Sequence, residues 1–160
     1  MKESHISIQR GTPQDIPALF SLIQGLAEYE KAPHEVTNTV EQLHQDAFGE
    51  QPLFGFWMAY EGDLPVGMAM YYFRYSSWKG KCLYLEDLYV LESYRKRKVG
   101  IELFKAIVRQ ARQDQCKRIS WQVLDWNQPA IDFYKKLDAS FDAEWVNCAL
   151  DQSQIEAFPL

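Results

Sequence analysis

An apolar strand that leads directly into a cationic loop and then a helix is the feature that most constrains this chain. Residues 83–90 read LYLEDLYV, and residues 94–100 read YRKRKVG before a helical pattern begins. The first N–H groups of a helix lack intrahelical partners and lie at the positive end of the helix dipole, so they bind anions. Glu86 and Asp87 interrupt the apolar strand, where carboxylates usually have a partner or a task. The segment predicts an anion site beside an acid site.

Hydrophobic periodicity predicts the elements around this segment. In chain order they are a strand at 6–10, a helix from Thr12 to about Tyr29, a short helix opened by a capping-box pattern at 38–41, strands at 54–61, 66–75 and 82–91, a helix from Val99, a strand at 118–124, a helix opened at 127–129, a strand at 141–150 and a short tail helix. The central strands have the spacing of an antiparallel meander. The whole order predicts an α/β chain with a mixed sheet covered by helices.

The composition is that of one globular domain spanning residues 1–160. The hydrophobic content is 47%, and no repeat or linker interrupts the sequence. Apolar runs are too short to cross a bilayer, and the N-terminus lacks the apolar region of a secretory signal, so a cytoplasmic protein without a membrane partner is expected. Cys82, Cys116 and Cys148 are far apart and lack nearby His partners. They are expected to be buried free thiols, with no metal site.

Acidic residues are concentrated in the first part of the chain. The net charge is −5, and residues 1–60 hold eight acids and three bases while the remainder holds fourteen of each. This asymmetry is typical either of a solvated acidic helix face or of a surface that attracts a cationic ligand. The basic run at 95–98 could be a solvated patch or a nucleic-acid contact. Overall acidity and the lack of a recognition motif argue against nucleic acid.

The motifs together resemble the GNAT acetyltransferases, and most closely the spermidine/spermine (diamine) acetyltransferase family. The resemblance is carried by these segments: LAEYE at 26–30, FGE at 48–50, MAMYYF at 68–73, Trp78, residues 80–81, 83–90 and 94–95, and WNQPAIDFYK at 126–135. It implies the GNAT fold, a mostly antiparallel twisted sheet with a splayed pair of parallel strands and helices on both faces. It also implies acetyl-coenzyme A as co-substrate, a small cationic amine as acceptor, and a homodimer.

In this family a loop reading R/Q-x-x-G-x-G/A holds the coenzyme pyrophosphate with its backbone amides. The chain keeps Arg95 and Gly100, but Lys98 replaces the middle glycine and Lys96 stands where polyamine acetyltransferases commonly have another. A lysine side chain makes left-handed backbone sterically unfavourable. This cost is absent if Lys98 already lies in the first turn of the helix. The coenzyme contacts implied by the resemblance are Leu88, Tyr89, Val90, Arg95, Lys96, Arg97, Lys98, Val99, Gly100, Asn127 and Tyr134.

Amine acetylation requires a neutral nitrogen, whereas an alkyl ammonium has a pKa of about 10.4. We expect Glu86 to accept the proton, through water, although pairing with a basic neighbour is an alternative. On a regular strand Glu86 and Asp87 would face opposite sides, so only one would face the reaction unless a bulge intervenes. Tyr134 matches the family's tyrosine acid, which protonates the leaving thiolate; a packed core tyrosine is its alternative. For Asn127, helix capping is the alternative.

The resemblance implies an acceptor site in which aromatic rings and acids surround an ammonium group. The matching positions are Tyr29, Glu30, Trp78, Glu86 and Asp87. A primary amine of a polyamine, diamine or lysine-like compound is the expected acceptor. Another small amine is an alternative, and a third hypothesis is a non-catalytic acetyl-coenzyme A-binding protein, motivated by the loss of glycine at Lys98.

Overall fold

A five-stranded mixed sheet forms the centre of the chain up to Gln122 in the computed structural model, which describes residues 5–160. The strands lie in chain order: β1 (Ile6–Arg10), β2 (Gly55–Glu61), β3 (Leu64–Ser76), β4 (Gly80–Val90) and β5 (Ile119–Ser120). Successive strands are antiparallel except β4 and β5, which are parallel. The antiparallel meander predicted for the central strands is confirmed.

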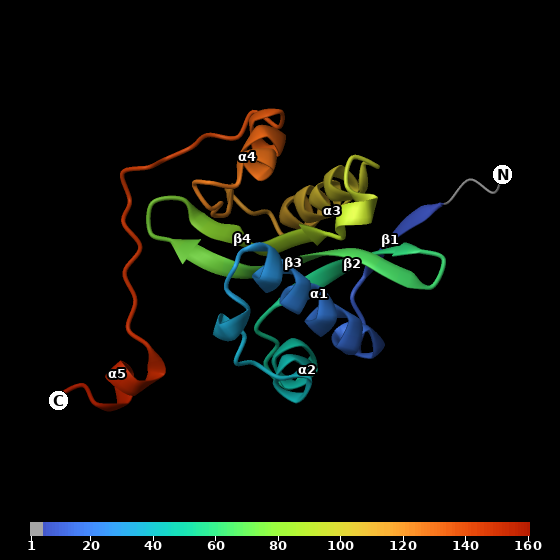
Figure 1. The fold of residues 1–160 in the computed structure, drawn as a ribbon. Coiled ribbons are helices and arrows are strands. Elements are labelled where there is room, and N and C mark those ends of the chain that lie inside the picture. Colours follow the sequence, from blue (N-terminus) through green and yellow to red (C-terminus); the bar gives the residue numbers. More distant parts are fainter. Residues whose placement is uncertain (1–4) are drawn as a thin grey trace. The chain divides into compact units, whose positions relative to one another are not determined.

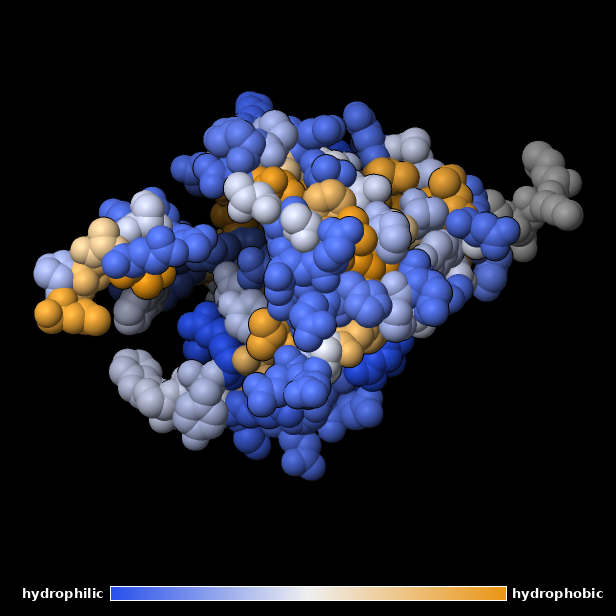
Figure 2. Space-filling view, turned by 90° about the horizontal axis from the view of Figure 1, so that it is seen from below, coloured by the Kyte–Doolittle hydropathy of each residue, from blue (hydrophilic) through white to orange (hydrophobic). Residues whose placement is uncertain are grey.

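Helices cover both faces of this sheet (Figure 1). Helices α1 (Ile16–Tyr29) and α2 (Val40–Phe48) lie on one face, and α3 (Val99–Gln113) lies on the other. The predicted inward stripe of α3 is confirmed, because Val99, Leu103 and Ile107 are almost fully buried. The face over α1 and α2 is mostly hydrophilic, with scattered hydrophobic side chains (Figure 2).

The helix starts follow local capping chemistry. Thr12 donates its backbone N–H to the Asp15 carboxylate at 2.7 Å, opening a short 3₁₀ turn (Pro13–Asp15) before α1. The cap of α2 is Thr39, whose hydroxyl accepts the N–H of Gln42 at 3.1 Å, and not the preceding asparagine that the sequence pattern suggested. Two further 3₁₀ turns, Pro33–Glu35 and Glu92–Tyr94, follow α1 and β4.

Helix α1 lies very close to β4, and this fixes the end of α1 near the two strand acids. A Cβ atom at Gly25 would be 3.0 Å from the Tyr89 hydroxyl, so a larger residue there would require the Tyr89 ring to move. Tyr29, the last residue of α1, and Glu30, its C-cap, are partly buried. The acceptor residues expected on α1 are therefore held by backbone packing.

The residues after Gln122 form a second unit, described by itself. It contains α4 (Gln128–Lys135) and α5 (Gln152–Glu156). The strand predicted at 141–150 was wrong, because the structure has no strand between α4 and α5, and alternation along the sequence does not by itself provide the partner that a strand needs. The strand predicted at 118–124 is shortened to Ile119–Ser120. The single domain at 1–160 stays a prediction.

The thiols differ from expectation. Cys82 is buried, but Cys116 is only partly buried and Cys148 is exposed; all three are free. Between residues 5 and 160 no helix is long and apolar enough to cross a membrane. Residues 1–4, which belong to the N-terminus expected to lack a secretory signal, lie outside the described part of the chain.

Candidate functional site

A β-bulge at Glu86 determines how the two strand acids are displayed. In the β3–β4 register Leu85 pairs with Tyr71 and Asp87 pairs with Met70, so Glu86 is an extra residue without a partner on β3. A bulge interrupts the alternation of side chains and re-aims them. Glu86 is exposed and Asp87 is partly buried. The bulge therefore allows Glu86 and Asp87 to face the same side of the sheet, which a regular strand would not allow.

Asp87 lies within electrostatic range of two other carboxylates, Glu86 and Glu30, and we call the three the acid cluster. Burial raises the pKa of Asp87, and the negative charges of Glu86 and Glu30 raise it further, to about 7. Burial also raises the pKa of Glu30. The mutual effect of these acids places Asp87 within electrostatic range of both neighbours. A cation entering this cluster would relieve the repulsion, so the arrangement suits an ammonium group.

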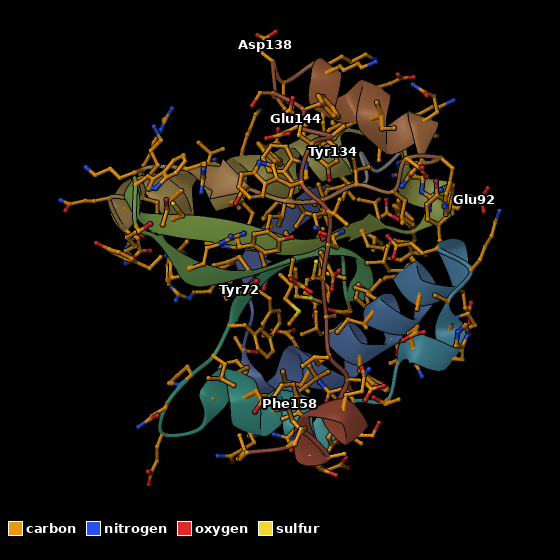
Figure 3. The ribbon with its side chains drawn as sticks, turned by 90° about the vertical axis from the view of Figure 1, so that its left-hand side faces the viewer. Tyr72, Glu92, Tyr134, Asp138, Glu144 and Phe158 are labelled. Atoms are coloured by element: carbon orange, nitrogen blue, oxygen red, sulfur yellow. The ribbon has the colours of Figure 1, made fainter. Side chains whose placement is uncertain are left out.

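Two tyrosines on the strands border the acids. The rings of Tyr72 on β3 and Tyr84 on β4 lie with centroids 5.2 Å apart, and the Glu86 charge raises the pKa of both hydroxyls, secondarily to burial. Figure 3 labels Tyr72. Sequence reasoning missed both tyrosines as site residues. The signal that could have found them is the hairpin itself, because a turn at residues 77–79 makes Tyr72 and Tyr84 direct cross-strand neighbours.

Arg95 connects the end of β4 to the end of α1. Its Nε donates to the Val90 carbonyl at 3.1 Å, and its guanidinium lies 4.5 Å from the centroid of the Tyr29 ring. A second ring, Tyr89, is 5.9 Å away. Arg95 and Tyr29 were expected on the coenzyme and on the acceptor respectively. The structure brings the two side chains together, so the loop after β4 contacts the end of α1.

Arg97 is directed toward β2. It donates to Glu61 at 2.6 Å, and the Tyr94 hydroxyl donates to the other oxygen of the same carboxylate at 2.5 Å. The guanidinium also lies over the Tyr94 ring, 4.6 Å from its centroid. In the described residues the side chains of Lys96 and Lys98 make no ion pair. Lys96 and Lys98, where the resemblance led us to expect glycine, are therefore lysines of this loop whose charges are not paired within the described residues.

The backbone at both lysines has the left-handed geometry that glycine favours. Lys96 has φ 61° and Lys98, the N-cap of α3, has φ 66°. Lys98 therefore lies before the first turn of α3. It carries the steric cost of left-handed backbone, which a position inside the helix would have avoided. Left-handed residues before a helix aim successive N–H groups into a concavity that binds anions. The loop keeps this geometry despite its sequence.

The open edge of β4 adjoins this loop. β4 pairs with β5 only at Leu83 and Tyr84, and past Tyr84 no strand of the described chain pairs with this edge. This is the splayed parallel pair that the family resemblance implied. Leu88, Tyr89 and Val90, which are partly buried, lie on the unpaired stretch. The Val90 carbonyl accepts from Arg95, and the other backbone groups that point outward on this edge suit an extended ligand, as at any strand edge.

The remaining predicted site residues lie elsewhere. Trp78 is in the turn between β3 and β4 and is 88% exposed. It is separated from Glu86 by about 20 Å of strand, so it is not part of the acid cluster of its own chain. Asn127 and Tyr134 belong to the second unit. Asn127 caps α4 by accepting the N–H of Ala130 at 3.3 Å, and the Tyr134 ring, labelled in Figure 3, contacts the Phe133 ring with centroids 5.3 Å apart.

The described residues include no group of three or more His, Cys, Asp and Glu side chains that could hold a metal ion. What the residues of the site do fit is a long ligand with an anionic group. The left-handed lysines and the start of α3 provide N–H groups and positive charge for phosphates, and the edge of β4 provides backbone partners for an amide-containing arm. Coenzyme A has both features.

Comparison with solved structures gives the class of this fold. An aminoglycoside acetyltransferase from an uncultured soil metagenomic sample, solved in complex with trehalose, superposes with a TM-score of 0.78 at 18% identity over 94% of this chain and 99% of its own. An integron cassette protein from the mobile metagenome of V. cholerae gives a TM-score of 0.77 at 23% identity, covering 94% and 95% of the two chains. At these identities the likeness concerns the fold alone.

Sequence comparison then gives the family. The chain belongs to the Acetyltransferase (GNAT) family, which matches residues 18–139. The thialysine N-epsilon-acetyltransferase of Mus musculus is 37% identical over 140 residues, 82% of each chain. The spermidine/spermine N(1)-acetyltransferase-like protein 1 of Homo sapiens is 36% identical over 88% of this chain and 22% of its own. The chain is an enzyme of the N-acetyltransferase class and fits the diamine acetyltransferase family.

Proposed function

We propose that this protein transfers the acetyl group of acetyl-coenzyme A to a primary amine of a small cationic acceptor, by direct attack in a ternary complex. The single observation that carries the proposal is the three-carboxylate cluster of Glu30, Glu86 and Asp87 beside the left-handed loop at Lys96 and Lys98. The cluster suits an ammonium group, and the loop suits a phosphate. Acetyl transfer from coenzyme A to an amine needs both.

The acid pair prepares the nucleophile. An ammonium ion held by Glu86 and Asp87 must lose a proton before its nitrogen can attack, and a base with a pKa near the working pH accepts that proton most effectively. Glu86 is the acceptor expected from the sequence, through water, and the raised pKa of Asp87 makes the bulged pair a coupled acceptor. The proton therefore passes to the pair, and the neutral amine remains beside Tyr72 and Tyr84.

The loop and the strand edge position the donor. Backbone N–H groups of Lys98, Val99 and Gly100 bind the pyrophosphate, with Arg95, Lys96 and Arg97 completing the positive loop. Leu88, Tyr89 and Val90 pair with the pantetheine arm, and one of their N–H groups stabilises the negative carbonyl oxygen. The donor supplies a thioester, whose acyl carbon bonds to the amine nitrogen as the carbon–sulfur bond breaks.

Tyr134 is the proposed source of the proton for the leaving group. The Tyr134 hydroxyl gives its proton to the departing thiolate, and Asn127 combines its capping role with a coenzyme contact. Tyr134→Phe removes only the hydroxyl. Turnover should fall with little change in acetyl-coenzyme A affinity, as measured by steady-state kinetics and calorimetry. Unchanged turnover would remove Tyr134 from the mechanism.

The acceptor is a polyamine, a diamine or a lysine-like amine. The names of the relatives support this, since they include thialysine and spermidine/spermine acetyltransferases. Tyr29 and Glu30 line the acceptor site with the strand acids, whereas Trp78, which lies far along the strand from Glu86, stays a prediction from the family resemblance. Aromatic rings and carboxylates together favour a cationic ligand. We place the protein in the cytoplasm, acting as a homodimer on small molecules without metal, nucleic acid or membrane.

Release of free thiol from acetyl-coenzyme A tests the proposal, with spermidine, a short diamine and lysine as acceptors. Thiol release with at least one amine, together with an acetylated product seen by mass spectrometry, is expected. Initial rates should vary with both substrates as in a sequential mechanism, because no acetyl-enzyme forms. A melting temperature raised by acetyl-coenzyme A with no thiol released by any amine would favour the non-catalytic binding protein instead.

A further inference from the structure

An arginine on β3 lies at the far end of the tyrosine pair from the acids. The Arg74 guanidinium is 5.3 Å from the centroid of the Tyr84 ring, which itself packs on Tyr72. Glu86 raises and Arg74 lowers the pKa of both tyrosine hydroxyls, so the two charges act on the same pair of rings. A positive group, two aromatic rings and a carboxylate therefore lie along one stretch of surface.

Arg74 is the cation available on this stretch. Within the described chain it makes no ion pair, and its side chain is exposed. The neighbouring cation Lys81 is occupied, because its Nζ is 3.2 Å from Asp114 and lies over the Phe73 ring. Arginine presents a planar fork of N–H donors that matches a carboxylate in two parallel hydrogen bonds. Its natural ligand is thus an anionic oxygen pair.

The spacing along β4 suits a short dipolar molecule. Tyr84, whose ring lies under Arg74, and Glu86 are two residues apart on β4, which is at most about 6.6 Å along the strand because the bulge at Glu86 shortens the rise. The extended side chain of an amino acid such as lysine separates its carboxylate from its terminal amine by a similar distance. Lysine also has an α-ammonium at this end, but its carboxylate can pair with Arg74, whereas a diamine of the same length brings only a second positive charge toward the guanidinium, which is unfavourable.

We propose that Arg74 binds the α-carboxylate of the acceptor, so that the enzyme prefers amino acids with a terminal side-chain amine over the corresponding diamines. This inference rests on the proposed function and specifies its substrate class. The amine points to Glu30, Glu86 and Asp87, the carbon chain lies on Tyr72 and Tyr84, and the carboxylate meets the guanidinium. Arg74 is then a specificity residue that takes no part in bond making.

The test compares L-lysine with cadaverine, which differ only by the carboxylate, in thiol-release kinetics. The wild-type enzyme should have the higher kcat/KM for lysine. Arg74→Gln should lower kcat/KM for lysine about tenfold or more, mainly through KM, because one charge-assisted pair is lost. The same change should leave the value for cadaverine unchanged or higher. Arg74→Lys should retain part of the preference, since it keeps the charge without the fork.

Lys79→Gln is the matched control, because it removes one positive charge from the exposed turn of the same hairpin. It should not alter the ratio of the two acceptors. An equal loss for lysine and cadaverine in Arg74→Gln, or an unchanged lysine preference, would overturn the role of Arg74 while leaving amine acetylation intact. Failure of the wild-type enzyme to acetylate any amine would overturn the proposed function, and the role of Arg74 with it.

Discussion

At the scale of single residues, Asp87 is the group whose chemistry the fold changes most. Its carboxyl is largely removed from water and lies within electrostatic range of Glu86 and Glu30, so its pKa rises to about 7. A raised carboxyl pKa means that the ionised form is unfavourable in the folded protein until a cation arrives. The residue is therefore suited to accept a proton from an ammonium ion at neutral pH.

The pH dependence of kcat/KM reports on this group. Activity should rise with pH through an inflection near 7 as Asp87 ionises. Glu86→Gln removes a like charge, so any residual activity should show this inflection at lower pH. Asp87→Asn should abolish it, whereas Asp63→Asn, which changes an exposed turn acid, should not. An inflection near 7 that persists in Asp87→Asn would assign it to another group.

The same shift has a consequence for stability. Because the folded-state pKa of Asp87 exceeds its unfolded value, the folded state binds more protons between about pH 4 and 7. Stability from this group is present at low pH and is lost as the pH rises toward 7. Asp87→Asn should therefore have a higher urea midpoint than wild type at pH 8, with a smaller gain at pH 5. Equal gains at both pH values would contradict the raised pKa.

At the scale of elements, the loop between β4 and α3 keeps a glycine geometry with lysine residues. The positive φ angles at Lys96 and Lys98 each carry a steric cost of about 1–2 kcal/mol. Such strain persists where a function requires the conformation. Here the conformation aims backbone N–H groups toward the proposed phosphate site, and the lysine side chains add charge to it.

Lys98→Gly should separate these two effects. Relief of the left-handed strain should raise the free energy of unfolding by about 1 kcal/mol, measured by urea denaturation. Acetyl-coenzyme A binding, measured by calorimetry, should weaken because a charge near the phosphates is lost. Lys79 does not have a positive φ, so Lys79→Gly should give neither the stability gain nor the weaker binding. Tighter binding in Lys98→Gly would show that the lysine is a defect in the loop.

The sequence predicted the meander and α3 because strand and helix periods are local properties of residues 54–113. It did not predict the bulge at Glu86, which arises from the pairing of β3 with β4. Nor did it predict that Arg97 would pair with Glu61 or that Arg95 would cover Tyr29, since both contacts join distant segments. The strand at 141–150 failed for the same reason, because alternation alone cannot supply a partner strand.

At the scale of the whole molecule, the second unit carries large exposed apolar side chains. Trp145 and Val146 are 79% and 83% exposed, and Ile155 and Phe158 are also exposed. Several such groups on one segment are typical of an interaction surface. This exposure, with the family resemblance, supports the homodimer that we propose.

Light scattering after size-exclusion chromatography should give the mass of two chains. Val146→Glu should shift the mass toward one chain, because a charge would enter the interface. Asp142→Asn, an exposed polar change nearby, should leave it unchanged. A wild-type mass of one chain at micromolar concentration would contradict the dimer.

The central claim is that the acid cluster and the cationic loop serve two ends of one reaction. The most direct test is the double variant Glu86→Gln/Asp87→Asn, studied by calorimetry with acetyl-coenzyme A and by mass spectrometry of the amine product. The predicted result is donor affinity close to wild type with the loss of most acetylated amine. Product formation at the wild-type rate by the double variant would contradict the account.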